Sequence, residues 1–537
     1  MDTHSLWKDI ISYVEKLAEY GEVIAGSKKD YEIAKTIRDD LRDQGLNARL
    51  IPLQVMEWIP GRGIIDIGGK EIDLTIQPYV QNAYVEAPLV YIDTNNVDKS
   101  CATIEDSIII TDLPPDVDDI NTAQLHLSEC GALGVIFIDR MECRRRIVCT
   151  GIWSPLKGVG KPPSIPVLQV PKSKGKEILR YWGSKTYLVV EGCKTGESTG
   201  YIVEAEIPSR YEDSECILIT SHHDHWLSGI ADNLVGVSMT MSISKLLITR
   251  SQTPKHCVKI VIFTAEESGA PNYSSWYWIY GSRKYAEENY SYIGAVINFD
   301  TIARGDRVTI SATPDLAHLM SIKAANLGIE VNTEFDQPIF DSFSFTMHGI
   351  SAATLNTFHE FLSSGIYHSS LDTIDILNRD TVIKAVALCI STVEQLALSN
   401  DIYGVLNPKK WSEYVLENLH KVNAPLELID SLYRVHRYLE IAKESEDIKA
   451  LMHSLISELI KPIMWNGYRH LGNREEILIA PWIIASMKNM WYEVVFEGLV
   501  EPPANIDPKK YAALKSQIVA KRINEFIERS LLKSSRK

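Results

Sequence analysis

The sequence lacks the features that would point to an extracellular scaffold or a membrane protein. Its eight cysteines contain no Cys-x-x-Cys pair, so neither a disulfide framework nor a zinc ribbon is indicated. Cys143 and Cys149 could form a local bridge, but thiols in a cytosolic protein usually stay reduced. No run approaches the roughly 20 apolar residues of a membrane-spanning helix, and the charged start of the chain shows no signal peptide. We therefore expect a cytoplasmic protein without a membrane segment.

Positive charge is also scarce. The chain has 55 basic and 70 acidic residues, for a formal charge of −15. This balance disfavours nucleic acid or an anionic membrane as the main partner. What the sequence does have is length, because 537 residues with 45% hydrophobic content are enough for several buried cores. More than one domain is expected.

The pattern of apolar residues divides the chain into four parts, three of which lie outside the central region. Residues 7–46 show helical spacing and predict two amphipathic helices. Residues 61–195 contain short β-rich runs between Pro, Gly and Asn turns, and predict a separate β-rich domain. Helical periodicity returns past about residue 401 and predicts a bundle. Its clearest helical patterns are 426–443, 448–460 and 511–532, with Pro502 and Pro503 separating the last from its predecessor.

The fourth part, residues 201–399, alternates apolar strands with helical patterns. This predicts an α/β fold with a mostly parallel sheet that is covered by helices. The predicted strands are 217–219, 258–263, 295–299 and 352–355. Ligands of open α/β sheets bind at the carboxyl ends of the strands, so polar residues that closely follow these strands are candidates for a site.

Five short stretches in this part carry histidines and carboxylates. They contain His222 and Asp224, Asp232, Glu266 and Glu267, Asp300, and His368. Zinc binds imidazole nitrogen and carboxylate oxygen, and two metals about 3.5–4 Å apart need a carboxylate that bridges them. Each stretch alone has a simpler explanation, such as a core pair, a helix start or a helix cap. Together, in this order, they predict one two-metal hydrolase site.

The same stretches resemble the zinc aminopeptidase and glutamate carboxypeptidase family in spacing and order. The matching segments are Ser221–Trp226, Asp232, Phe263–Glu267, Asn298–Asp300 and Tyr367–Ser369. The β-rich insert is similar to a protease-associated, or apical, domain. The helical tail is similar to the dimerisation domain of the glutamate carboxypeptidase and transferrin receptor branch.

This resemblance implies a zinc exopeptidase fold and a set of domain boundaries. The peptidase domain would comprise residues 1–60 and 196–399, with the two-metal site in the second part. The protease-associated insert would comprise residues 61–195, and residues 400–537 would form a helical domain through which two subunits make a homodimer.

The resemblance also implies a cofactor, two Zn²⁺ ions per subunit. Each zinc would have two ligands of its own, and one carboxylate would bridge the pair. The ligands are His222 and Asp300 for one zinc, Glu267 and His368 for the other, and Asp232 as the bridge. Zinc can lower the pKa of its water toward about 7, so a carboxylate can complete the activation near neutral pH.

Three further residues receive catalytic roles from the resemblance. Glu266 would be the general base, which takes a proton from the metal-bridging water and returns it to the leaving amine. Asp224 would accept a hydrogen bond from the second ring nitrogen of His222 and so fix its tautomer. Tyr367 would donate a hydrogen bond to the tetrahedral oxyanion.

Other residues are candidates for the substrate pocket. Asp341 lies in a segment that resembles a pocket-lining segment of the family, and Trp226 is expected to pack beside the site. The run Trp276, Tyr277 and Trp278 could wall an apolar pocket, although aromatic residues at such spacing more often serve packing.

Several histidines and arginines have simpler interpretations. His223 and His225 flank a ligand, and we expect them to line the pocket rather than to bind metal. The run Arg144–Arg146 could reach an acidic substrate from the insert, but a solvated loop is favoured. His348 and His359 match no motif and are expected to be structural.

The peptide substrate is defined only in part. The glutamate-cleaving branch has arginines before the last histidine ligand, and residues 352–364 contain none, which disfavours a glutamate carboxypeptidase. An acidic pocket suits the free ammonium group of a peptide, and we predict an aminopeptidase. The alternatives are a carboxypeptidase or another small-amide hydrolase, and a receptor-like protein that has lost catalysis. The complete ligand set argues against this last alternative.

Overall fold

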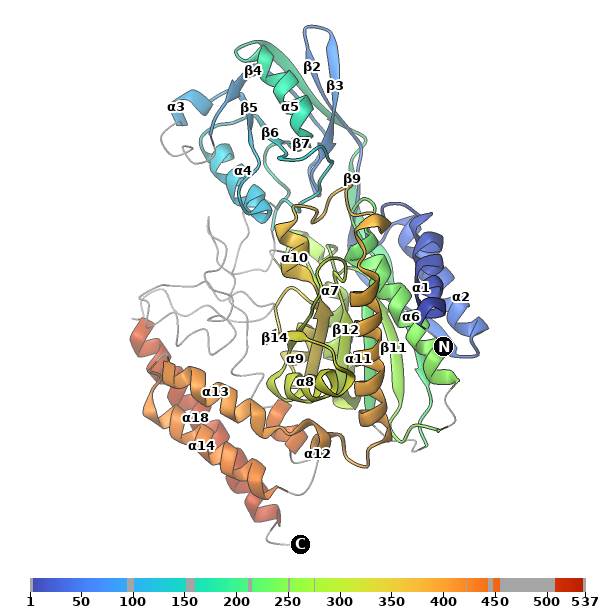
Figure 1. Ribbon diagram of the computed structural model, residues 1–537. Coiled ribbons are helices and arrows are strands. Elements are labelled where there is room, and N and C mark those ends of the chain that lie inside the picture. Colours follow the sequence, from blue (N-terminus) through green and yellow to red (C-terminus); the bar gives the residue numbers. More distant parts are fainter. Residues whose placement is uncertain are drawn as a thin grey trace.

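A computed structural model describes most of the chain (Figure 1). The described residues are 3–93, 101–150, 160–210, 215–249, 252–274, 276–421, 423–442, 448–453 and 508–534. They form an α/β domain, a closed β-barrel inserted near its start, and a helical tail.

The α/β domain is built on an eight-stranded sheet with the order β1-β9-β11-β10-β12-β15-β13-β14. The strands are β1 (Asn47–Ile59), β9 (Lys194–Ile207), β10 (Cys216–His222), β11 (Val258–Phe263), β12 (Ile293–Phe299), β13 (Val308–Ala312), β14 (Val331–Phe335) and β15 (Ser351–Asn356). The central pairs β11–β10, β10–β12 and β12–β15 are parallel, as is β13–β14. The pairs β1–β9, β9–β11 and β13–β15 are antiparallel. The expected mostly parallel sheet is therefore a mixed sheet, with its parallel pairs mainly at the centre.

Helices cover both faces of this sheet because neighbouring strand residues point to opposite sides. In β10, Ile217 and Ile219 belong to one buried cluster, whereas Leu218 belongs to another. The first cluster includes the helices α1 (Thr3–Ala18), α2 (Lys28–Asp43), α6 (Val235–Ile248), α8 (Pro314–Leu327) and α11 (Arg379–Leu398). The second includes α7 (Tyr280–Asn289) and α9 (Asp341–Thr346).

The insert is a closed barrel with the strand order β2-β3-β7-β6-β5-β4-β8. Its strands are β2 (Arg62–Ile67), β3 (Lys70–Ile76), β4 (Ala83–Tyr91), β5 (Ile108–Asp112), β6 (Gly134–Ile138), β7 (Val167–Val170) and β8 (Lys185–Glu191). Its helices are α3 (Cys101–Ile104), α4 (Ile120–Glu129) and α5 (Lys172–Ile178). The long antiparallel pair β1–β9 leads from the sheet into the barrel, which lies at one end of the α/β domain in Figure 1.

Helices follow the α/β domain to the end of the described chain. They are α12 (Ile402–Leu406), α13 (Lys409–Lys421), α14 (Leu426–Ile441) and α18 (Pro508–Ser534). The helices α14 and α18 agree closely with the helical patterns 426–443 and 511–532. Most of the expected helix 448–460, together with Pro502 and Pro503, lies outside the described residues.

Two disulfides correct the expectation that the cysteines stay unpaired. Cys101 is bonded to Cys130 within the insert, and Cys216 is bonded to Cys257 in the α/β domain. Cys143 and Cys149, whose pairing was considered from the sequence, are instead free and buried. Disulfides persist mainly in oxidising compartments, and the cytoplasmic location stays a prediction.

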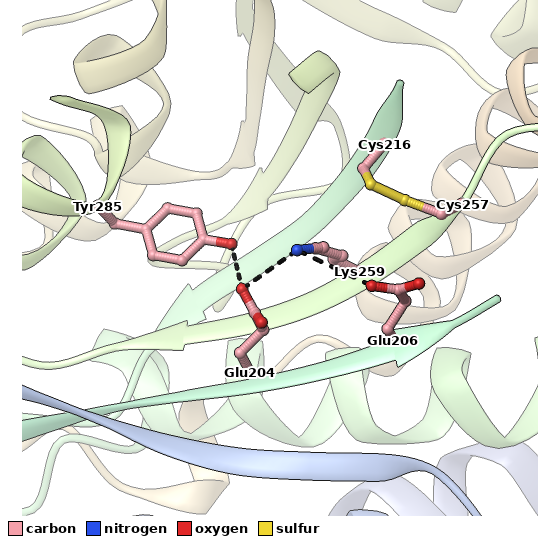
Figure 2. Close-up of a disulfide and its surroundings, with 6 residues drawn as sticks. All are labelled: Glu204, Glu206, Cys216, Cys257, Lys259 and Tyr285. Carbon is pink, nitrogen blue, oxygen red and sulfur yellow. Dashed lines mark hydrogen bonds and ion pairs between the residues drawn. A yellow bond between two sulfur atoms is a disulfide. The ribbon is translucent and has the colours of Figure 1, made fainter. Parts of the chain in front are cut away.

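The second disulfide joins two neighbouring parallel strands at their starts. Cys216 begins β10 and Cys257 directly precedes β11, as Figure 2 shows. Close by, Tyr285 donates a hydrogen bond of 2.5 Å to the carboxylate of Glu204, and Lys259 lies 3.5 Å from the same group. Burial would raise the pKa of Glu204, but these two partners and Arg49 together lower it below its ordinary value.

Helix α11 is long and apolar enough to cross a membrane by length and composition alone. However, 56% of its apolar window is buried inside the protein. Val382, Val386 and Val393 of this helix belong to the largest buried cluster of the α/β domain. These contacts are those of a core helix.

Candidate metal centre

The central strands bring the first site residues to one edge of the sheet. His222 is the last residue of β10 and is in register with Phe263, the last residue of β11. Asp300 directly follows β12 on the other side of β10. Glu266 and Glu267 lie in the turn after β11. The sequence placed these residues behind successive strands, and the sheet brings the strand ends together.

The other two ligands lie farther from the strand ends. Asp232 lies in the segment Ile230–Leu234 that leads into α6, and its own backbone is not helical, with φ −124° and ψ 81°. His368 lies in the loop after α10 (Phe358–Ser363) and has a left-handed backbone with φ 52°. A non-glycine residue is uncommon in this conformation and must be held there by its surroundings.

The five expected ligands form two groups that share one carboxylate. His222 Nε2 lies 3.5 Å from Asp232 Oδ1 and 3.5 Å from Asp300 Oδ2. The other oxygen of Asp232 lies 3.6 Å from His368 Nε2, which is 2.8 Å from Glu267 Oε2. In each group the three ligand atoms lie within 4.8 Å of one another. The two groups are thus joined through Asp232.

This donor set fits divalent metal ions. Among the described residues, His222 Nε2 and Glu267 Oε1 are buried and have no hydrogen-bond partner. Burial and the charges of neighbouring carboxylates raise the pKa of Asp232, Glu266 and Glu267 well above the ordinary value. Several buried carboxylates close together ionise only when a cation balances their charge. Imidazole nitrogens and carboxylate oxygens are ligands that suit zinc.

Asp224 is placed differently from the expectation. His222 Nδ1 lies 3.0 Å from the backbone carbonyl of Asp224, while the Asp224 carboxylate is 3.8 Å away. This carboxylate instead accepts hydrogen bonds from the backbone N–H groups of Glu266 and Glu267, at 3.2 and 3.1 Å. Asp224 can therefore fix the tautomer of His222 through its carbonyl, while its side chain positions the turn that carries the glutamate pair.

Asp372 is a site residue that the sequence did not reveal. Its carboxylate accepts hydrogen bonds from the backbone N–H groups of Ala231 and Asp232, at 2.8 and 3.2 Å. Burial raises the pKa of Asp372 to about 7, although these backbone donors lower it. Asp372 orients the turn that presents the shared carboxylate. No sequence signal marked it, because its partners lie about 140 residues earlier.

A cavity of about 200 Å³ opens beside the metal-binding groups. Among the described residues, its lining contains acidic and apolar side chains but no lysine or arginine. The insert contributes Asp116, Ile147 and Val148, which sequence reasoning missed. The α/β domain contributes the rest of the lining, namely Asp232, Glu266, Glu267, Tyr277, Trp278, Asp300, Thr301, Pro338, Ile339, Phe340, Phe358, Tyr367 and His368.

The expected pocket residues divide between this lining and the core. Tyr277 and Trp278 line the cavity, so part of the aromatic run does face the site. Asp341 and Trp226 are buried and are not among the residues that line it, so of the roles considered for Asp341 the position favours one behind the pocket. Asp341 lies behind the site, where its charge raises the pKa of Glu266, and its own pKa is raised by burial to about 7. Trp226 packs edge-on against Trp58 at the junction with the insert.

Tyr367 lies beside the last ligand, as the sequence suggested. Its ring stacks on that of His368, with ring centroids 3.7 Å apart, and contacts the edge of Phe358. Tyr367 also lines the cavity. It is therefore in a position where its side chain can face a bound substrate.

The flanking histidines are packed in the core rather than exposed to the pocket. His223 Nε2 lies 2.8 Å from Asp30 Oδ1, and both residues are fully buried. The ring of His225 faces two backbone carbonyls, and burial lowers its pKa to about 4. His348 stacks on Tyr290, and His359 pairs with Glu334.

The arginine run is not the solvated loop that was expected. Arg145 is 2% exposed and Arg146 is 8% exposed. Arg145 pairs with Asp139, and Arg146 pairs with Glu22. Both are buried because this loop packs against the α/β domain beside His368.

The sequence of the α/β domain matches a known peptidase family. Residues 203–393, which include the five expected metal ligands and Glu266, match the profile of peptidase family M28. The chain thus carries a peptidase M28 domain. The predicted resemblance is confirmed, and the protein is a zinc-dependent metallopeptidase.

Solved structures of other proteins show the same fold as this chain. It is similar to a zinc aminopeptidase from Bacillus subtilis, with TM-score 0.58 and 17% identity over 73% of this chain and 95% of the other. It is also similar to a peptidase M28 precursor from Shewanella amazonensis, with TM-score 0.58 and 18% identity over 74% and 96% of the two chains. An aminopeptidase from Aneurinibacillus sp. strain AM-1 gives TM-score 0.52 and 20% identity over 75% and 95%. Comparison with curated protein sequences gives no significant match.

Proposed function

We propose that this metallopeptidase is a two-zinc aminopeptidase that removes residues from the free N-terminus of peptides. The main support for two metals is the position of Asp232, whose two oxygens face His222 and His368 respectively. His222 and Asp300 would hold one zinc, Glu267 and His368 the other, and Asp232 both. When bound, zinc would polarise the scissile carbonyl and make water more acidic.

Glu266 is proposed as the general base. Its carboxylate lines the cavity and lies 3.8 Å from His222 Nε2, so it is close to the metal-binding groups. It would take a proton from the attacking water and deliver it to the leaving amine. Asp224 supports this role, because its carboxylate accepts the backbone N–H of Glu266 and so fixes the turn. Tyr367 would donate a hydrogen bond from its hydroxyl group to the oxyanion, a stabilisation worth about 3 kcal/mol in comparable sites.

The charge of the cavity favours an aminopeptidase over a carboxypeptidase. Its described lining has neither lysine nor arginine, and of its five carboxylates Asp116 and Glu266 are not assigned to zinc. These two carboxylates would attract the ammonium group of a free N-terminus, and the lining offers no lysine or arginine for a C-terminal carboxylate. Two of the similar structures are aminopeptidases by name, which supports the same proposal. A carboxypeptidase or another small-amide hydrolase is the enzymatic alternative.

A receptor-like protein without catalysis is the alternative from another class. All five expected ligands and Glu266 are present and close together, which supports an active enzyme.

We also propose that the helical tail forms a homodimer, because Leu426, Tyr433 and Ile441 of α14 expose 75%, 47% and 62% of their surface. Sedimentation as a monomer at micromolar concentration would contradict the dimer.

The test compares free and N-acetylated dipeptides as substrates of the zinc-loaded protein. We expect hydrolysis of the free dipeptides alone, and a decrease in kcat of about 10²–10⁴-fold for Glu266→Gln. Glu71→Gln, at an exposed position of β3 in the insert, is the matched control and should keep full activity. Cleavage of both substrate forms would exclude an aminopeptidase. A protein that binds no zinc, or an active Glu266→Gln variant, would exclude the mechanism.

A further inference from the structure

The loop after β6 of the insert is paired with the loop that carries His368. Arg145 and Ser369 form an antiparallel bridge between the two loops. The backbone N–H of Arg146 donates to the carbonyl of His368, at 3.0 Å. The backbone N–H of Ser370 donates to the carbonyl of Arg144, at 2.9 Å. A ligand loop of the α/β domain is therefore hydrogen-bonded, backbone to backbone, to the insert.

The side chain of Arg145 adds a second connection. Its guanidinium donates through Nη2 to the carbonyl of Gly365, at 2.7 Å, and through Nη1 to the carbonyl of Tyr367. Its Nε donates to Asp139 at 2.8 Å, which balances the buried charge. The planar fork of arginine can bind several acceptors in fixed directions at once. Arg145 thus fixes the backbone immediately before His368.

The insert also reaches the turn that carries Glu267. The hydroxyl of Tyr79 accepts a hydrogen bond from the backbone N–H of Gly269, at 3.0 Å. Within this turn Ala265 has a left-handed backbone, with φ 57°. Both ligands of the second group are therefore on irregular backbone that residues of the insert contact. We call Glu267 and His368 the loop half of the site.

The other two unshared ligands are supported by the sheet. His222 is the last residue of β10, which pairs with β11 and β12. The backbone N–H of Asp300 donates to the carbonyl of Leu355 in β15. We call His222 and Asp300 the strand-end half. Its geometry comes from the central sheet itself.

We infer that Arg145 is a positioning residue through which the insert sets the zinc affinity of the loop half and not that of the strand-end half. This inference rests on the proposed two-zinc function. Without the guanidinium, the carbonyls of Gly365 and Tyr367 lose a buried donor, and His368 is no longer fixed opposite Glu267. Loss of such outer contacts typically lowers metal affinity by about 10–100-fold.

Single-site backgrounds separate the two halves. His222→Ala leaves the loop half as the intact zinc-binding group, and His368→Ala leaves the strand-end half. Zinc affinity is measured by titrating metal-free protein with Zn²⁺ against a chromophoric chelator. We expect Arg145→Gln to weaken zinc binding about 10–100-fold in the His222→Ala background and to have no effect in the His368→Ala background.

Arg146→Gln is the matched control. Arg146 lies in the same loop, but its guanidinium pairs with Glu22, and only its backbone contacts His368. We expect Arg146→Gln to leave the zinc affinity of the loop half within about threefold of the parent. This change is smaller than the one expected when a contact that orients a metal ligand is lost. Arg145→Lys, which keeps the charge but not the fork, should fall between parent and Arg145→Gln. If Arg145→Gln fails to fold, this lysine variant and Asp139→Asn take its place.

The outcomes distinguish this inference from the proposed function. Parent protein that binds fewer than two zinc ions would overturn the two-zinc proposal itself. Two zinc ions in the parent, with an unchanged loop-half affinity in Arg145→Gln, would overturn the inference alone. Equal losses in both backgrounds, or an equal loss in Arg146→Gln, would show general destabilisation and would also overturn it.

Discussion

The two halves of the metal centre contain the same kinds of ligand, but the protein supports them in different ways. The strand-end half has His222 and Asp300 at the ends of fully buried strands that have hydrogen-bonded neighbours on both sides. The loop half has Glu267 and His368 on irregular backbone that is bonded to the insert. Sites on strands are more precise than sites on loops unless other contacts fix the loops.

The insert packs against the half of the metal centre that lacks support from the sheet. Its loop after β6 supplies the backbone partners of His368 and also two apolar residues of the cavity wall, Ile147 and Val148. One short segment thus contacts both a metal ligand and the space for substrate. A change in the position of the insert would therefore alter metal binding and the cavity together, while the central strands would stay in place.

Metal removal should have the largest effect, and the effect should be uneven. Zinc that binds only the folded protein, at a concentration about a thousand times its dissociation constant, adds about 4 kcal/mol to the free energy of unfolding. A chelator removes this contribution. We expect amide exchange to rise in residues 264–269 and 364–370 and to change little in β10 and β12. Hydrogen–deuterium exchange measured by mass spectrometry checks this. Equal increases of amide exchange in loops and strands would contradict the proposed difference between the two halves.

The sequence predicted most of the strand-end half because its signals are local. The apolar runs 217–219 and 295–299 predicted strands, and polar residues at strand ends meet at one edge of a parallel arrangement. The order of the family motifs then identified Asp232, Glu267 and His368 as the remaining ligands. Strand direction could not be predicted in this way. The apolar run 352–355 predicted the strand that is β15, but periodicity does not show that its partner β13 runs antiparallel to it.

The support of the loop half was invisible in the sequence. The contact of Arg145 with Tyr367 joins residues 222 positions apart, and no periodicity or spacing marks such a pair. A run of three arginines is usually a solvated segment, and here two of the three are buried by a packing contact between domains. Fold and ligands follow from local pattern, whereas the contacts that orient them depend on tertiary packing.

The disulfide of the α/β domain should contribute to stability without tuning the site. Cys216 and His222 are the first and last residues of β10, so the bond to Cys257 lies at the far end of the strand (Figure 2). We expect Cys216→Ser with Cys257→Ser to lower the free energy of unfolding by about 2–4 kcal/mol and to leave both zinc affinities unchanged. Urea unfolding and zinc titration measure these two quantities.

The disulfide of the insert provides the control for the Cys216→Ser and Cys257→Ser double variant. Cys101→Ser with Cys130→Ser removes a bond of similar sequence separation, 29 against 41 residues, from a domain that contains none of the expected ligands. It should leave the unfolding of the α/β domain unchanged. A loss of zinc binding in the Cys216 and Cys257 variant would mean that the strand ends depend on the far end of the sheet, and the strand-end half would not be rigid by itself.

Asp372→Asn should have the smallest effect, and one that both halves share. Asparagine keeps one acceptor oxygen but turns an N–H₂ group toward the backbone N–H groups of Ala231 and Asp232, which costs about 1–3 kcal/mol. Because Asp232 belongs to both groups of ligands, we expect similar decreases of zinc affinity in the His222→Ala and His368→Ala backgrounds. The exposed Asp375→Asn is the matched control. A decrease in only one background would show that Asp232 serves one metal, and the two halves would then be separate sites without a common bridge.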